Sequence, residues 1–440
     1  MLQTLWLFGG EFHVEHDQPG LGSDLWKYDL FKGTWEMAHN GSSKTNNVPA
    51  ARQLAAGCGV IGSYLVLYGG LGSAGGQDEK DVPLDDTWIF NIADKHWYTL
   101  EEFRAKVGAE NSTATPGARG DMASWCTDSH ELMVFGGFDK GNGLHNDLWI
   151  FNMQTLQWKL SDRSSGMPKD NQFVSHLPYP VGRSGATTWS VKNDLFMFGG
   201  NIDPKNGRSK HLMVGNVNEM WRYGLDKDEW TFLSGERHLC TRAGSYGELG
   251  VALKSNAPGC RRRAAGWVDV RSNLWLFGGD GVDSSQESVT VFQHSKLLSD
   301  IWYFNRYTHL WVWKGGDKVG DLKGQFGDKG ERSRNYHPGG RSEPVAWGAF
   351  SKFYLLGGIG HDKDGKDGYL DDIWELDPRS DPSIMKNKPY PGPVFTVIFF
   401  GLGLMVFMAV LYLLESRYHI VRPSVRGRKY TQIPVDIPDE

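Results

Sequence analysis

The sequence predicts an all-β repeat fold of six four-stranded sheets, followed by a single C-terminal transmembrane helix. The 440 residues include 56 glycines, and 13% of all residues are aromatic, which is typical of short strands joined by tight turns. A Gly-Gly pair ends an apolar run six times. Residues 394–414 are 21 successive positions without a charge, which is long enough to cross a bilayer.

Composition and charge exclude several other classes of protein. No Gly-X-Y period is present, so collagen is excluded, and the dense aromatic residues argue against disorder. A net charge of -5 gives no basic field for nucleic acid. Four cysteines in a chain of this length cannot form a disulfide scaffold.

Each repeat copy shares a set of spaced markers. An acid-x-Trp motif follows every Gly-Gly pair, as in Asp147-Leu148-Trp149. A further tryptophan comes nine residues later in five copies, and Pro-x-x-Arg precedes the pair in five. The glycines are Gly9, Gly10, Gly69, Gly70, Gly136, Gly137, Gly199, Gly200, Gly278, Gly279, Gly357 and Gly358. The later tryptophans are Trp35, Trp97, Trp158, Trp230 and Trp311, and the arginines are Arg52, Arg119, Arg183, Arg261 and Arg341.

These markers divide each copy into four strands. The first strand follows the arginine, and the second ends at Gly-Gly, where glycine lets the backbone leave the sheet. The third strand carries the acid-x-Trp tryptophan, and the fourth carries the later one. We expect the tryptophans to fill the space between neighbouring sheets.

The pattern resembles the kelch repeat over residues 1–378. That resemblance implies a six-bladed β-propeller with one four-stranded blade per repeat. Attractin-type membrane kelch proteins are similar in architecture only, because their EGF and CUB modules are absent. Some galactose-oxidase-like enzymes have a kelch-type propeller with a copper site, but their residues have no counterparts here.

The first and last copies are incomplete. The first lacks its first strand and the sixth lacks the tryptophan-bearing fourth strand. A propeller closes its ring by completing one blade from both termini, which removes open sheet edges. We therefore expect either an imperfectly closed ring of 22 strands or, as the favoured reading, an N-terminally truncated chain. A hidden seventh blade is a further alternative.

Variation in loop length predicts the working face. The second-to-third and fourth-to-first connections vary widely and share one face, whereas the other connections are nearly constant. Insertions concentrated on one face usually mark the binding surface. We expect a protein or glycan ligand to bind there, in an adhesion or receptor-like role.

The repeated arginines are the first candidate site. Symmetry places them around the channel mouth, where they could bind an anionic ligand. The alternative is that each arginine pins its own blade, which is the commoner role for a residue repeated in every blade.

Other candidates are fewer. Cys240 and Cys260 lie in one long loop and could pair in an oxidising compartment, whereas Cys58 and Cys126 are expected to be an unpaired buried filler and an opposite-facing strand residue. No G-x-S-x-G, P-loop or HExxH motif is present. We predict a protein that is not an enzyme, with no metal site and no cofactor.

The C-terminal region predicts topology. A stalk (379–393) precedes the span (394–414), and a tail (415–440) follows with more basic residues, which favours a cytoplasmic C-terminus. The propeller would then be extracellular or lumenal, in agreement with glycosylation sequons at Asn40 and Asn111. Tyr430 and Ile433 fit a sorting motif. The alternative is a tail-anchored scaffold with a cytosolic propeller.

Overall fold

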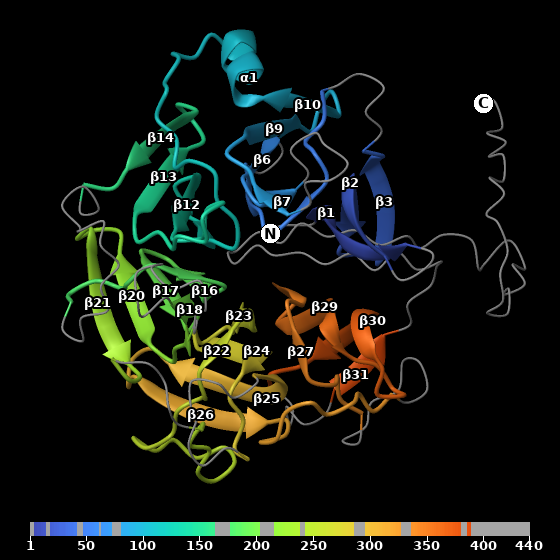
Figure 1. Ribbon diagram of the computed structural model, residues 1–440, viewed down its shortest axis with the longest axis vertical. Coiled ribbons are helices and arrows are strands. Elements are labelled where there is room, and N and C mark those ends of the chain that lie inside the picture. The colour runs from blue at the N-terminus through green and yellow to red at the C-terminus, as the bar shows by residue number, and fades with distance from the viewer. Residues whose placement is uncertain are drawn as a thin grey trace, which may run out of the picture.

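Six antiparallel sheets follow one another in chain order around a central axis in the computed structural model (Figure 1). The model describes residues 4–14, 18–41, 47–60, 63–72, 81–162, 177–202, 215–237, 243–285, 295–326, 336–379 and 385–388. Nearly all regular structure is β-strand. The prediction of an all-β fold is therefore confirmed, and the arrangement is consistent with a kelch propeller.

Five sheets have four strands each, counted from the axis outward. The second is β5 (Ala56–Val60), β6 (Tyr64–Tyr68), β9 (Thr87–Asn91) and β10 (His96–Thr99). The third is β11 (Ala123–Cys126), β12 (Glu131–Phe135), β13 (Leu148–Asn152) and β14 (Gln157–Leu160). The fourth is β16 (Thr187–Val191), β17 (Asp194–Phe198), β20 (Met220–Gly224) and β21 (Glu229–Ser234). The fifth is β23 (Ala265–Val268), β24 (Leu274–Gly281), β25 (Lys296–Asn305) and β26 (Leu310–Gly315). The sixth is β28 (Val345–Ala349), β29 (Lys352–His361), β30 (Asp367–Leu376) and β31 (Met385–Lys388).

The first sheet has three strands: β1 (Thr4–Val14), β2 (Gln18–Asp29) and β3 (Thr34–His39). As the sequence predicts, no inner strand pairs with β1 among the described residues. The sixth sheet differs from expectation, because β31 pairs with β30 as a fourth strand. This strand lies inside the predicted stalk and has no tryptophan, so the repeat markers did not reveal it.

Short strands form a rim where the chain enters each blade. These are β4 (Arg52–Gln53), β7 (Leu71–Gly72), β8 (Val82–Pro83), β15 (Arg183–Ser184), β18 (Asn201–Ile202), β19 (Gly215–Asn216), β22 (Arg261–Arg262) and β27 (Arg341–Ser342). Each repeated arginine except Arg119 begins one of these strands.

The Gly-Gly pairs hold a backbone conformation that other residues rarely adopt. Both glycines of all six pairs have positive φ, for example 63° at Gly9 and 105° at Gly10. A Cβ atom on Gly9 would lie 2.8 Å from the Arg52 carbonyl oxygen in the next blade. The pair therefore provides both the turn and the close approach of neighbouring blades.

The fourth-strand tryptophans pack between blades in a repeating way. Each one contacts the aromatic residue that precedes the Gly-Gly pair of the preceding blade. Ring centroids are 5.2 Å apart for Phe8–Trp97, 4.7 Å for Tyr68–Trp158, 5.2 Å for Phe135–Trp230 and 4.9 Å for Phe198–Trp311. Trp35 is in one core cluster with Leu356 of the sixth blade, which brings the two ends of the ring together.

One helix, α1 (Leu100–Val107), follows β10 in a fourth-to-first connection, although no helix was expected there. Thr99 and Glu102 form a capping box at its start, and Gly108 ends it with φ 72°. Buried Arg104 then donates to the Leu156 carbonyl in the third blade, 2.9 Å from Nε. The helix thus fastens the second blade to the third.

The predicted single-pass membrane localisation must be corrected. In the part of the chain that the structure describes, no helix is long and apolar enough to cross a membrane. Residues 394–414 and 415–440, including Tyr430 and Ile433, lie outside the described residues.

Candidate functional site

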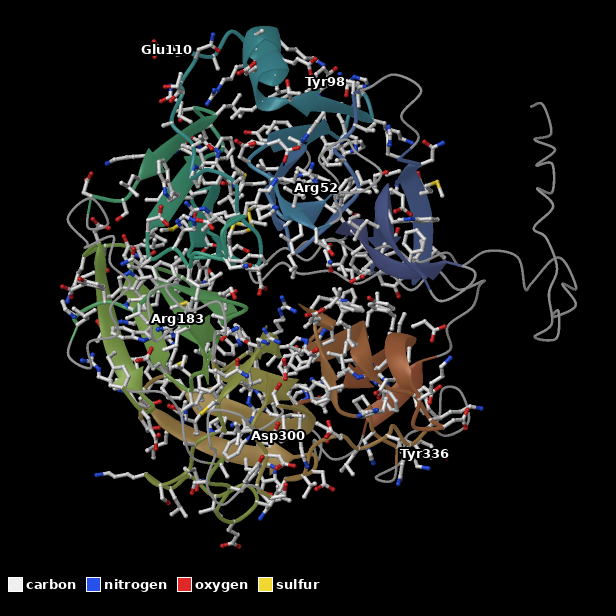
Figure 2. All side chains as sticks on the ribbon, viewed as in Figure 1. Arg52, Tyr98, Glu110, Arg183, Asp300 and Tyr336 are labelled. Atoms are coloured by element: carbon white, nitrogen blue, oxygen red, sulfur yellow. A yellow bond between two sulfur atoms is a disulfide. The ribbon has the colours of Figure 1, made fainter. Side chains whose placement is uncertain are left out.

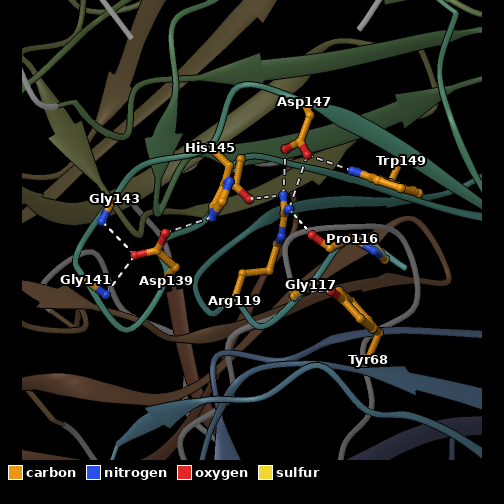
Figure 3. A network of polar contacts seen from close by, with 11 residues as sticks. Tyr68, Pro116, Gly117, Arg119, Asp139, Gly141, Gly143, His145, Asp147 and Trp149 are labelled. Atoms are coloured by element: carbon orange, nitrogen blue, oxygen red, sulfur yellow. Dashed lines mark hydrogen bonds and ion pairs between the residues drawn. The ribbon is translucent and has the colours of Figure 1, made fainter. Parts of the chain in front are cut away.

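The repeated arginines lie inside the blades, where each binds the acid of the acid-x-Trp motif. Figure 3 shows the third-blade example, in which Arg119 Nη1 donates to Asp147 Oδ1 at 2.6 Å. The same carboxylate accepts from Trp149 Nε1 at 2.7 Å. Arg119 also donates to the Gly136 carbonyl at 3.2 Å. One arginine therefore joins the first, second and third strands of its blade.

The same network recurs in the other four complete blades. The acid partners are Asp86 for Arg52, Glu219 for Arg183, Asp300 for Arg261 and Asp372 for Arg341. All five arginines are at most 1% exposed, and Figure 2 labels Arg52, Arg183 and Asp300 within their blades. Arg52 and Arg119 hold the pKa values of Asp86 and Asp147 below their ordinary range, against the opposing effect of burial.

This burial corrects the suggested ligand ring. A guanidinium that is enclosed and bonded to a carboxylate and to carbonyls of its own blade cannot reach an incoming anion. We therefore interpret the five arginines as architectural, which is the alternative that the sequence favoured.

A different ring lines the channel mouth, two residues after each arginine. These positions are Leu54, Asp121, Gly185, Arg263 and Glu343, all with positive φ. Backbone N–H groups link them in turn around the axis: Asp121 to Leu54, Gly185 to Asp121, Arg263 to Gly185 and Glu343 to Arg263, at 2.7–3.1 Å. The links join successive blades from the second to the sixth.

Three of these side chains form a charged bridge across the mouth. Arg263 binds Asp121 at 3.0 Å through Nη2 and binds Glu343 through Nη1. Burial is the main cause that raises the pKa of Glu343, to about 7, and nearby Asp121 adds to it while Arg263 opposes it. Glu343 therefore titrates near neutral pH at the channel entrance.

This raised pKa predicts a pH-dependent stability. Because the folded state binds the Glu343 proton more tightly than the unfolded chain does, its contribution is full below about pH 4.5 and is lost as pH rises through about 7. Glu343→Gln should remove that part of the slope. The check is thermal unfolding of both proteins between pH 4.5 and 8. Parallel curves for the two proteins would contradict the assignment.

A cavity of about 810 Å³ occupies the centre of the ring. Inner-strand residues such as Trp189, Trp267 and Trp347 line it, together with Glu343. On the side of the first blade, Trp6 of β1 lines it directly. The cavity therefore reaches the edge where the first blade has no inner strand.

The loop between β21 and β22 makes an exposed apolar surface on the variable-loop side. We call Leu249, Val251 and Leu253 the loop patch; their exposed fractions are 51%, 37% and 43%. Tyr246 anchors the loop, because its hydroxyl donates to Asp300 at 2.9 Å and its ring packs 4.9 Å from that of Trp302.

Internal bonds fix the shape of this loop. Buried Asn256 donates through Nδ2 to the Val251 carbonyl at 2.8 Å, and the Gly250 N–H donates to the Trp313 carbonyl at 2.8 Å. The loop patch is therefore held in place before any partner binds, which reduces the entropy lost on binding.

The cysteines do not follow the expectation for Cys58 and Cys126. A disulfide joins these two residues, and thereby the inner strands of the second and third blades. Cys260 is also disulfide-bonded. Its proposed partner Cys240 lies outside the described residues, so the pairing of Cys240 with Cys260 stays a prediction. Asn40 and Asn111 are both exposed, and their glycosylation likewise stays a prediction.

Known proteins with kelch repeats are similar to this chain, although no family model matches it. Kelch domain-containing protein 1 of Homo sapiens is 22% identical over 334 residues, covering 70% of this chain and 65% of that protein. An F-box/kelch-repeat protein of Arabidopsis thaliana is 26% identical over 159 residues, covering 34% and 29%. N-(sulfonatooxy)prop-2-enimidothioate sulfolyase of Thlaspi arvense is 27% identical over 139 residues, covering 31% and 33%. The chain thus spans less than two thirds of each relative, and the similarities to kelch proteins support the kelch-repeat family that the motifs indicate.

Proposed function

We propose that this protein is a non-enzymatic binding module that recognises another protein through the variable-loop face of its propeller. The loop patch carries this proposal. Three exposed apolar side chains on an anchored loop are typical of a contact surface for another protein. The kelch-repeat relatives are in keeping with a protein-binding propeller.

The opposite face supplies a matched control. Val270 lies in the β23–β24 turn and Tyr307 in the β25–β26 turn of the same blade, with exposed fractions of 74% and 70%. These residues are as apolar and more exposed, but they lie in the short turns of nearly constant length. A partner that binds through the loop face should not depend on them.

The test uses a photo-crosslinking amino acid placed at position 251 or at position 270 of the full chain in its source cells. We expect a protein that crosslinks from position 251 and not from position 270. Leu249→Ser/Val251→Ser/Leu253→Ser should then weaken the purified complex at least about tenfold, because central apolar contacts contribute most of the binding energy. Val270→Ser/Tyr307→Ser should leave the affinity unchanged.

The opposite result would contradict the proposal. Crosslinking from position 270 alone, or an affinity that the triple variant does not change, would place the contact elsewhere. Thermal unfolding of each variant separates loss of contact from loss of fold, since exposed substitutions usually change stability by less than about 0.5 kcal/mol.

A further inference from the structure

The inner edge of β1 has the features of a seat for one more strand. In the second blade, Gly69 N–H donates to Asp86 and the Ser63 carbonyl accepts from Ile92, so alternate residues of β6 face β9. Their neighbours Tyr64, Val66 and Tyr68 therefore face the inner strand β5. The equivalent β1 residues are Thr4, Trp6 and Phe8, and no strand of the described residues pairs with that edge.

The backbone ring at the channel mouth is open at the same place. Its bonds run from Leu54 of the second blade to Glu343 of the sixth. No bond among the described residues joins Glu343 back to Leu54. A residue contributed by an inner strand of the first blade would lie between them and complete the ring.

An acid of the first blade has no arginine. Asp24 accepts from Trp26 at 2.6 Å, as its counterparts do from their own tryptophans, but the first copy has no Pro-x-x-Arg. Burial raises the pKa of Asp24, whereas the pKa values of Asp86 and Asp147 are lowered beside their arginines. The first blade therefore presents a carboxylate that complements an incoming guanidinium.

A buried indole in the cavity also has no partner. The inner-strand residues Trp125, Trp189 and Trp267 each donate at 3.0 Å to a carbonyl of the following blade. Trp347, which is 5% exposed and lines the cavity, donates to no described residue. Its equivalent acceptor would be the Trp6 carbonyl, so the sixth and first blades lack the contact that three other blade pairs make.

We propose that this seat binds an extended segment of another polypeptide, which adds an antiparallel inner strand to β1. The chain's own inner strands state the chemistry of that segment. Arginine precedes tryptophan by six residues in Arg119/Trp125, Arg183/Trp189, Arg261/Trp267 and Arg341/Trp347, with small or β-branched residues beside the tryptophan. The arginine binds Asp24, the strand backbone binds the β1 edge, and the tryptophan fills the cavity.

The probe is a labelled peptide with the sequence of residues 179–192 of this chain, which contains Arg183 and the inner strand β16. We expect saturable 1:1 binding to the full chain, followed by fluorescence anisotropy, and slower amide exchange at Thr4–Phe8. Asp24→Asn should weaken binding about tenfold, because charge-assisted hydrogen bonds are the strong ones. Asp162→Asn, at an exposed aspartate that pairs with Lys159, should have no effect.

A double-mutant cycle tests the contact itself. The peptide with Arg183→Gln should bind about tenfold more weakly to the wild-type chain, and Asp24→Asn should weaken it no further. Losses that simply multiply would overturn the Asp24 contact, and absence of saturable binding would overturn the seat. If the full chain instead dimerises with Thr4–Phe8 protected and excludes the peptide, the occupant is a second copy and the proposed partner is wrong. The seat is separate from the loop patch, so either proposal can fail alone.

Discussion

Arg261→Met is expected to lower the free energy of unfolding by about 3–5 kcal/mol, the usual effect of removing one partner of a buried ion pair. Arg261 and Asp300 are both fully buried, and their two hydrogen bonds are 2.5 and 2.8 Å long. Loss of the guanidinium leaves the Asp300 carboxylate in a site shielded from water, with only Tyr246 and Trp302 as donors. The Gly278 carbonyl also loses its donor.

Guanidinium-induced unfolding followed by circular dichroism measures the effect. The surface pair of Arg379 with Asp377 provides the control, since Arg379 is 62% exposed and Arg379→Met should change stability by less than about 1 kcal/mol. Arg261→Met/Asp300→Asn should be more stable than the sum of the two single variants predicts, because no uncompensated charge remains. An Arg261→Met protein as stable as the Arg379→Met protein would contradict the architectural role.

The arginine network shows how far repeat markers go. The markers predicted the strands and the conserved spacing because each depends on local preferences of glycine, alternating apolar residues and tryptophan. Arg119 and Asp147 are 28 residues apart, so no local rule joins them. The signal was nevertheless present, because every copy with the arginine also has the acid. Pairing these two markers would have placed both side chains inside one blade.

Other features follow from the tertiary structure and not from the repeat. Asp121, Arg263 and Glu343 occupy the same position in three copies but share no residue type, so only the closed ring brings their charges together. The loop patch depends on Tyr246 reaching Asp300, 54 residues away. Helix α1 was predictable in part, since Thr99 and Glu102 have the spacing of a capping box. Strand β31 was not, because it contributes only its backbone pairing.

The tryptophans between blades should be the other main source of stability. Trp97→Ala and Trp158→Ala are each expected to lower the free energy of unfolding by about 3–5 kcal/mol, since both remove a large buried ring. Trp97 lies 5.2 Å from Phe8 and 5.1 Å from Phe90. Trp158 lies 4.7 Å from Tyr68 and 5.1 Å from Phe151. Guanidinium-induced unfolding of the two alanine variants checks this expectation.

Phenylalanine variants separate ring packing from hydrogen bonding. Trp158 Nε1 donates to Thr87 Oγ1 at 3.1 Å, whereas Trp97 Nε1 has no partner among the described residues. Trp158→Phe should therefore cost about 1 kcal/mol more than Trp97→Phe, because it leaves the buried Thr87 hydroxyl without its donor. Equal losses for the two phenylalanine variants would mean that the indole bond contributes nothing across the blade boundary. Alanine variants that unfold at the wild-type midpoint would contradict the larger claim, since blade association would then not depend on these rings.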